Sequence, residues 1–167
     1  MRGIVALGVS IILIDLTSPS RASAQQRADS AFRELQERGK RVMGVDQYTS
    51  SHIFQSLPDG GRIELQRDKD DSLGVRVIRA HMQDVTARFT AGDFSLSAEV
   101  HGTHEIPGTA AMRSSRAAIR YEYRELPRGG EVRLTSGDGA AIKAIHEFLA
   151  FQRSDHRTEH KHPQGNG

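Results

Sequence analysis

Histidine and methionine are the side chains of this sequence whose type and number suggest metal chemistry. The chain of 167 residues contains 8 His and 4 Met but no Cys. Imidazole nitrogen suits zinc and copper, and thioether sulfur favours Cu(I). His101 and His104 lie three positions apart, and Met112 follows in the same weakly periodic stretch. This set predicts a metal site that takes copper before zinc; solvated histidines and a methionine that fills a core gap are the alternative.

Three more histidines gather near the C-terminus. His156, His160 and His162 lie in a polar segment with few apolar residues. The spacing His-x-x-x-His-x-His is suited to weak chelation of a divalent ion, an interpretation that rests on composition. A solvated chain end without a function is the alternative.

A second candidate cluster comes from histidines in the body of the chain. His52 lies in a predicted strand, and His81 and His146 each flank the apolar stripe of a predicted helix. Tyr121 takes the place of His52 when the two halves of the chain are aligned. A buried His pair beside a carboxylate would suit metal binding or acid–base catalysis. Each of these residues alone is more often a half-buried, hydrogen-bonded side chain.

Composition and missing motifs exclude several classes of protein. Without Cys there is no disulfide, no thiolate-bound metal centre and no cysteine nucleophile. The chain has 23 basic and 21 acidic residues, a net charge of +2, which gives no electrostatic footprint for nucleic acid. A strand-to-helix phosphate loop, G-x-S-x-G and H-E-x-x-H are all missing from the sequence. Whether the protein is an enzyme is therefore left open by the sequence.

Periodicity places the candidate residues on helices and β-hairpins. Residues 26–41 have the apolar spacing of an N-terminal helix. Residues 48–57 and 62–67 alternate on either side of a Pro-Asp-Gly-Gly turn, which predicts a hairpin. The apolar residues between Val75 and Phe89 are spaced three and four apart, as on one face of a helix.

The same order of elements returns in the second half. Residues 117–126 and 131–134 predict another hairpin, and residues 141–152 predict another helix. The two turns align at a shift of 69 positions, Leu57–Leu65 against Leu126–Leu134. Internal repetition of this kind indicates a duplicated structural unit, although two hairpins can also be alike by chance.

A duplicated hairpin–helix unit predicts a two-layer α+β domain. Two hairpins supply four antiparallel strands, and two helices can cover one face of the sheet. We place the repeat units at about residues 48–91 and 117–153. The stretch between them, residues 92–116, is expected to be a long loop, and loops of that length in a small domain are often functional.

The first residues are typical of an export signal. A basic start at Met1 and Arg2 precedes a mainly apolar stretch from Gly3 to Leu16, and Ala22-Ser23-Ala24 fits a cleavage site. The apolar stretch is shorter than the roughly 20 residues that span a bilayer. We expect a signal peptide (1–24), one domain (25–153) and a flexible, His-containing tail (154–167). The mature protein is then periplasmic or secreted, without stable membrane insertion.

Three runs resemble a family of small exported bacterial proteins of unknown function. They are residues 43–52, 57–67 and 146–156, and the resemblance spans about residues 39–157. It implies no mechanism and no catalytic residues. Some members carry the name aspartate carbamoyltransferase, which this sequence does not support. The chain is too short for the two α/β domains of that enzyme, and Met112–Arg116 departs from its S-T-R-T phosphate motif.

The leading hypothesis is an exported protein that binds copper or zinc for metal handling. An envelope module that binds a protein or ligand partner without a metal is a second hypothesis, using the open sheet face or an edge strand. A small enzyme with His52 or His81 as the base is a third. Oligomeric state is not indicated by the sequence.

Overall fold

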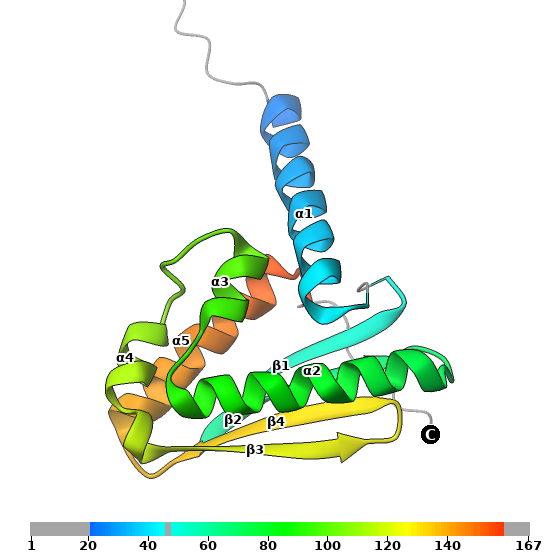
Figure 1. The fold of residues 1–167 in the computed structure, drawn as a ribbon. Coiled ribbons are helices and arrows are strands. Elements are labelled where there is room, and N and C mark those ends of the chain that lie inside the picture. Colours follow the sequence, from blue (N-terminus) through cyan, green and yellow to red (C-terminus); the bar gives the residue numbers. More distant parts are fainter. Residues whose placement is uncertain (1–20, 46–47, 159–167) are drawn as a thin grey trace, which may run out of the picture.

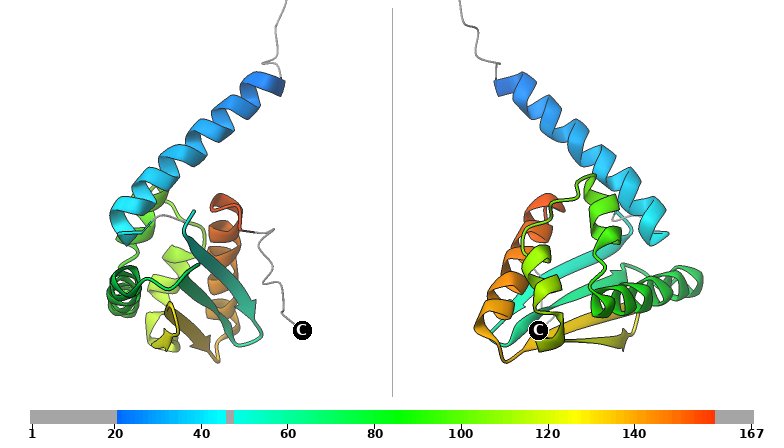
Figure 2. Two further views of the ribbon diagram at one scale, coloured as in Figure 1. Left: turned by 90° about the vertical axis from the view of Figure 1, so that its right-hand side faces the viewer. Right: turned by 60° about the vertical axis from the view of Figure 1, so that its left-hand side comes forward.

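A computed structural model of the chain describes residues 21–45 and 48–158 and confirms the α+β class (Figure 1). In chain order the elements are α1 (Arg21–Met43), β1 (Ser50–Leu57), β2 (Gly60–Arg67), α2 (Ser72–Ala91), α3 (Ser95–His101), α4 (Thr109–Ser114), the 3₁₀ turn η1 (Arg116–Ala118), β3 (Ile119–Leu126), β4 (Gly129–Ser136) and α5 (Gly139–Asp155). The strands form one antiparallel sheet in the order β1-β2-β4-β3. Figure 2 shows α2 and α5 on the same side of this sheet.

The two hairpins meet through their second strands, and the register there has two-fold character. Ile63 of β2 pairs directly with Val132 of β4, and these residues are 69 positions apart, the same shift that aligns the two turns. The register on either side of this pair is reciprocal, because Gly61 pairs with Leu134 and Leu65 pairs with Gly130. This is the arrangement that a duplicated hairpin produces when the two copies pair around a local two-fold axis.

Glycine is required where the central strands approach each other. A Cβ atom on Gly60 would collide with the carbonyl oxygen of Leu134, and one on Gly129 would collide with the carbonyl oxygen of Leu65. Gly60 also has a φ of 137°, a conformation that other residues rarely adopt. The Pro-x-Gly-Gly turns thus supply small residues for the sheet as well as a chain reversal.

The helices also follow the two-fold relation, because each covers the hairpin of the other unit. α2 packs mainly on β3 and β4, whereas α5 packs mainly on β1 and β2. The helix N-caps are Asp71 and Asp138, whose carboxylates accept backbone N–H groups of the first turn. These caps are 67 positions apart, so a shift of 67 aligns the two helices.

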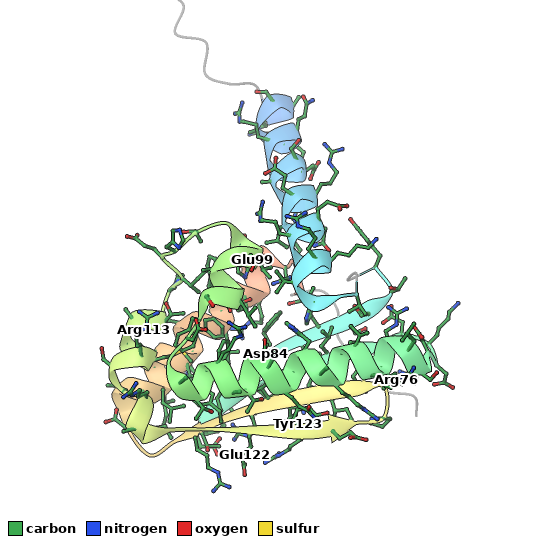
Figure 3. All side chains as sticks on the ribbon, in the orientation of Figure 1. Arg76, Asp84, Glu99, Arg113, Glu122 and Tyr123 are labelled. Atoms are coloured by element: carbon green, nitrogen blue, oxygen red, sulfur yellow. The ribbon has the colours of Figure 1, made fainter. Side chains whose placement is uncertain are left out.

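The core lies between the sheet and α2 and α5. Leu65 and Leu134, on which the predicted strand registers depend, are fully buried, as are Ile78 and Ile145 at equivalent helix positions. The opposite face of the sheet has no helix over it and carries charged residues instead. The labelled Glu122 side chain points to that side in Figure 3.

On this open face, two buried carboxylates share arginine partners. Glu64 and Glu131 pair across β2 and β4 and are only 7% and 4% exposed. Arg62 lies 2.6 Å from Glu64 and 3.5 Å from Glu131, and Arg124 lies 3.5 Å from Glu131. Two like charges directly opposite would destabilise the sheet, so the arginines are needed for this pairing.

Helix α1 contacts the domain from Ala28 onward, and Figure 2 shows its N-terminal end extending away. The guanidinium of Arg38 donates a hydrogen bond of 2.8 Å to the carbonyl oxygen of Val100. Arg157 lies over the ring of Phe32 and donates to the carbonyl oxygen of Ala28 at 3.0 Å. These contacts hold Met43, at the end of α1, against the core.

Two expectations about loops are wrong. Residues 92–116 contain α3, α4 and η1 rather than one long loop. Glycines with positive φ (Gly92, Gly102 and Gly108) separate these elements, which makes each too short for periodicity to be visible. The chain after residue 153 also begins differently from the expected tail, because α5 continues to Asp155 and His156 is 4% exposed. Among the described residues, the helices lack a segment long and apolar enough to cross a membrane.

Candidate functional site

A cavity of about 60 Å³, partly open to solvent, lies where α1, α2, α3 and α5 meet β1. Four of the eight histidines of the chain line it, together with two methionines and one glutamine. These residues are His52, His81, His101, His156, Met43, Met82 and Gln152. The rest of the wall is almost entirely aliphatic and aromatic. Polar groups at an apolar cavity need hydrogen-bond partners or a ligand, which makes this the candidate site.

His101 is held between two side chains of α5. Its Nδ1 forms a short hydrogen bond with the Asp155 carboxylate, and its Nε2 lies 2.9 Å from Gln152 Oε1. The His101 side chain is 1% exposed, and the ring also packs against Phe151 with ring centres 4.8 Å apart. The carboxylate fixes Nδ1 as the nitrogen that carries the proton. Nε2 is therefore the nitrogen that faces Gln152.

Gln152 completes this arrangement. Its Nε2 atom is buried and lacks a hydrogen-bond partner among the described residues. When the ring of His101 is neutral, Nε2 accepts a hydrogen bond, and the Gln152 amide supplies the donor by turning over. Gln152 can thus serve either as donor or as acceptor toward His101, depending on what the imidazole needs.

His52 and His156 lie next to each other and share an aromatic neighbour. Their ring centres are 5.3 Å apart, and each is within 5.4 Å of the ring centre of Phe54. His156 also contacts His101, with ring centres 5.1 Å apart. The imidazole of His156 therefore lies between that of His52 on β1 and that of His101 at the end of α3.

Comparison of the two repeat units shows that this histidine pair replaces an aromatic pair. The strand shift of 69 matches His52 with Tyr121, and the helix shift of 67 matches His156 with Phe89. Phe89 and Tyr121 pack edge to face with ring centres 6.0 Å apart. One half of the molecule thus buries a Phe–Tyr pair where the other half buries two imidazoles. Packing at this position does not require histidine.

Burial governs the charge state of two of these histidines. Desolvation lowers the pKa of His156 well below its usual value, and the neighbouring His52 and His101 act in the same direction. Desolvation also lowers the pKa of His81 to about 4, against a smaller opposite effect of Asp84. Both rings are neutral at pH 7. The hydrogen bond with His101 keeps the pKa of the Asp155 carboxyl below its ordinary value, so this group is an anion there.

The structure separates the predicted loop site. His101 lines the cavity, but His104 is exposed and Met112 is fully buried in the core. The walls of the cavity include neither of these two residues. Met112 instead fills the core, which is the alternative that the sequence also allowed.

The other candidates divide in a similar way. His156 is buried beside His52 rather than in a tail, which corrects that expectation, whereas His160 and His162 lie outside the described residues. His52 and His81 both line the cavity. His146 and Tyr121, the other two members of the second cluster, lie outside the cavity wall.

His146 and Tyr121 have structural surroundings. His146 Nε2 donates to the carbonyl oxygens of Leu57 and Gly60, at 2.9 and 3.0 Å, and so ties α5 to the β1–β2 turn. Arg79, its counterpart at a shift of 67, donates to carbonyls of the β3–β4 turn in the same way. Tyr121 packs on Phe89. Neither His146 nor Tyr121 lines the cavity.

Sequence reasoning missed Gln152, Asp155, Met43 and Met82. Gln152 and Asp155 lie on one helical face with His156, at spacings of three and four, but residues 154–156 were assigned to a tail. Met43 and Met82 have the spacing of core residues, and nothing in their local sequence separates a cavity wall from a core. As placed, the His, Asp and Glu side chains of residues 21–45 and 48–158 form no group of three that could hold a metal ion.

Comparison of the chain with protein-family models, with curated proteins and with solved structures gives no significant match. The resemblance to exported bacterial proteins therefore stays a prediction, and the function must be inferred from the site.

Proposed function

We propose that the cavity binds one transition-metal ion, with the imidazoles of His52, His101 and His156 as ligands. The observation that carries this proposal is that a buried Phe–Tyr pair in one half of the molecule is replaced by a His–His pair in the other half, beside a third imidazole. Imidazole is costlier to bury than an aromatic hydrocarbon. A bound metal ion would explain why three imidazoles lie next to one another in the core.

The spacing of the rings supports this proposal. Two imidazoles that bind one tetrahedral ion, each at about 2.0–2.1 Å from nitrogen to metal, have ring centres about 5 Å apart. The His52–His156 and His101–His156 distances between ring centres are 5.3 and 5.1 Å. Two of the three ring separations therefore match the separation that a shared ion would require. Rotation of the rings about their side-chain torsions then brings the nitrogens onto the ion.

The groups around His101 fit the role of outer partners. Histidine ligands commonly donate their second ring nitrogen to a carboxylate, which orients the ring and raises its basicity. Asp155 makes this contact with Nδ1, which leaves Nε2 for the metal. Gln152 occupies Nε2 in the structure described, so binding requires the Gln152 amide to move aside.

The size of the cavity favours an ion over a substrate. About 60 Å³ accommodates a few water molecules, far less than the several hundred cubic ångströms of a typical small-molecule site. A catalytic His101–Asp155 pair would need such a site for its substrate. The open sheet face, in turn, is an ion-paired polar surface rather than an apolar docking face. The export pattern of the first residues supports metal handling in the periplasm or outside the cell.

The decisive variant transplants the aromatic pair. His52→Tyr combined with His156→Phe introduces the residue types of the Tyr121–Phe89 pair that the other half of the molecule already buries. The variant is therefore expected to fold. Full-length protein without an affinity tag is titrated with Cu(II) and Zn(II) by calorimetry. We expect one tight site in the parent and none in the double variant, whereas His104→Ala, an exposed control, binds as the parent does. Equal binding by parent and double variant contradicts the proposal.

A further inference from the structure

Sulfur is distributed unevenly around the fold. Of the four methionines of the chain, Met43 and Met82 line the histidine cavity, and both are nearly fully buried, at 6% and 2% exposed. Met112 is also buried but does not belong to that wall. Thioether sulfur is therefore concentrated at the place where the imidazoles meet.

The duplicated fold shows that one of these methionines is not needed for packing. The helix shift of 67 matches Met82 with Leu149, which is fully buried. The equivalence is visible in space, because Leu149 approaches Gly61 and Met82 approaches Gly130, two glycines at equivalent strand positions. An aliphatic side chain fills this position in one repeat, and a thioether that lines the cavity fills it in the other.

Met43 comes from a different part of the chain. It is the last residue of α1, and it reaches the same cavity as Met82, which lies in the middle of α2. Thioethers are soft ligands that favour Cu(I) over zinc and over Cu(II). Two of them beside three imidazoles make a donor set of mixed nitrogen and sulfur in a wall that is otherwise mainly apolar.

We propose that the ion taken by this site is Cu(I), with the sulfur of Met43 or Met82 joining the imidazoles. This inference rests on the proposed metal site and adds the oxidation state and the softness of the ligand set. It also predicts that loading ties either the end of α1, through Met43, or the middle of α2, through Met82, to His52 of β1.

The test compares three methionine variants of the full-length protein. Met43→Leu/Met82→Leu removes both cavity sulfurs with little change in volume, and Met112→Leu is the matched control in the core. Cu(I) is supplied without oxygen in competition with bicinchoninate, and Zn(II) binding is measured in parallel. We expect the double variant to bind Cu(I) about tenfold more weakly or worse, with Zn(II) unchanged. Met112→Leu should bind both ions as the parent does.

The outcomes separate this inference from the proposed function. Parent protein that binds Zn(II) and Cu(I) through the histidines, but loses no Cu(I) affinity in the double methionine variant, overturns the inference and leaves the metal site standing. Equal losses of Cu(I) and Zn(II) affinity also overturn it, because they indicate damage to packing. Parent protein that binds neither ion overturns both. X-ray absorption of the Cu(I) protein provides a second measurement, in which sulfur scattering must be present in the parent and weaker in the double variant.

Discussion

Asp155 is the residue through which the orientation of His101 is set. Its carboxylate accepts from Nδ1 of a side chain that is 1% exposed. Asp155→Asn keeps the size of the side chain but removes the charge and weakens the hold on the ring. We expect metal affinity to fall about 10–100-fold, the usual effect of losing an outer-shell partner. Calorimetry measures this, with Glu147→Gln as a control, since Glu147 lies on the same helix and pairs only with the exposed Lys143. Unchanged affinity in Asp155→Asn would show that the carboxylate does not act on a ligand.

His81 makes stability depend on pH. Burial lowers its pKa from 6.5 to about 4, so between these values the unfolded chain takes up a proton that the folded protein does not. The free energy of unfolding should therefore decrease by about 2–3 kcal/mol as the pH falls from 6.5 to 4. Urea unfolding across this range measures the effect. His81→Gln should lose less stability on acidification than the parent. The same acid sensitivity in both proteins would assign the effect to other groups.

At the scale of elements, the two central strands should contribute equally to stability. Leu65 of β2 and Leu134 of β4 are both fully buried at equivalent positions. Leu65→Ala and Leu134→Ala should each lower the free energy of unfolding by about 2–5 kcal/mol, the usual range for deleting a buried Leu side chain. Denaturant unfolding measures the losses, with the exposed Leu73→Ala as a control. A loss below about 1 kcal/mol at either central position is incompatible with this packing.

The elements that could be predicted are the ones with long, regular patterns. The hairpins, α2 and α5 follow from alternation, helical spacing and repeated turns. The glycine-containing turns recur because Gly60 lies close to the backbone of Leu134 and Gly129 lies close to that of Leu65. Helices α3 and α4 were missed because each has only seven or six residues. The end of α5 was missed because His156 is polar in the sequence but buried by His52 and Phe54.

The candidate site was only half predictable for the same reason. Imidazole and thioether identified the chemistry, and His52, His81, His101 and His156 were all candidates. Their grouping depends on how α3 and α5 fold over β1, which local patterns do not encode. The partner of His101 was expected nearby at His104 but is Asp155, 54 positions away. The sequence therefore indicated which residue types mattered but not which residues meet.

At the scale of the whole molecule, the export signal that the sequence predicts would determine which residues the mature protein contains. The apolar stretch before Ala22-Ser23-Ala24 predicts cleavage after Ala24, which removes only the first four residues of α1. Those residues are far from the cavity, so the mature protein should bind metal as the full chain does. The intact mass of protein from an envelope fraction checks this, with Gln25 as the expected first residue. A chain that retains residues 1–24 contradicts the prediction.

The two halves of the duplicated fold differ in the residues that they bury at equivalent positions. The half built from β3, β4 and α2 buries Tyr121 and Phe89 where the half built from β1, β2 and α5 buries His52 and His156. Met82 of the first half takes the place that Leu149 has in the second. The common sheet stabilises both halves, and so do α2 and α5, each of which packs on the hairpin of the other repeat. The proposed metal site would explain this asymmetry between the halves.

The most direct test is to follow the imidazoles themselves during metal binding. Two-dimensional NMR that correlates ring protons with ring nitrogens is recorded while Zn(II), a redox-inert ion, is added to the untagged protein. The account predicts that the signals of His52, His101 and His156 change together and saturate at one equivalent, while those of His104 and His146 stay in place. Changes confined to His104, His160 and His162, with the three cavity rings unaltered, would contradict it.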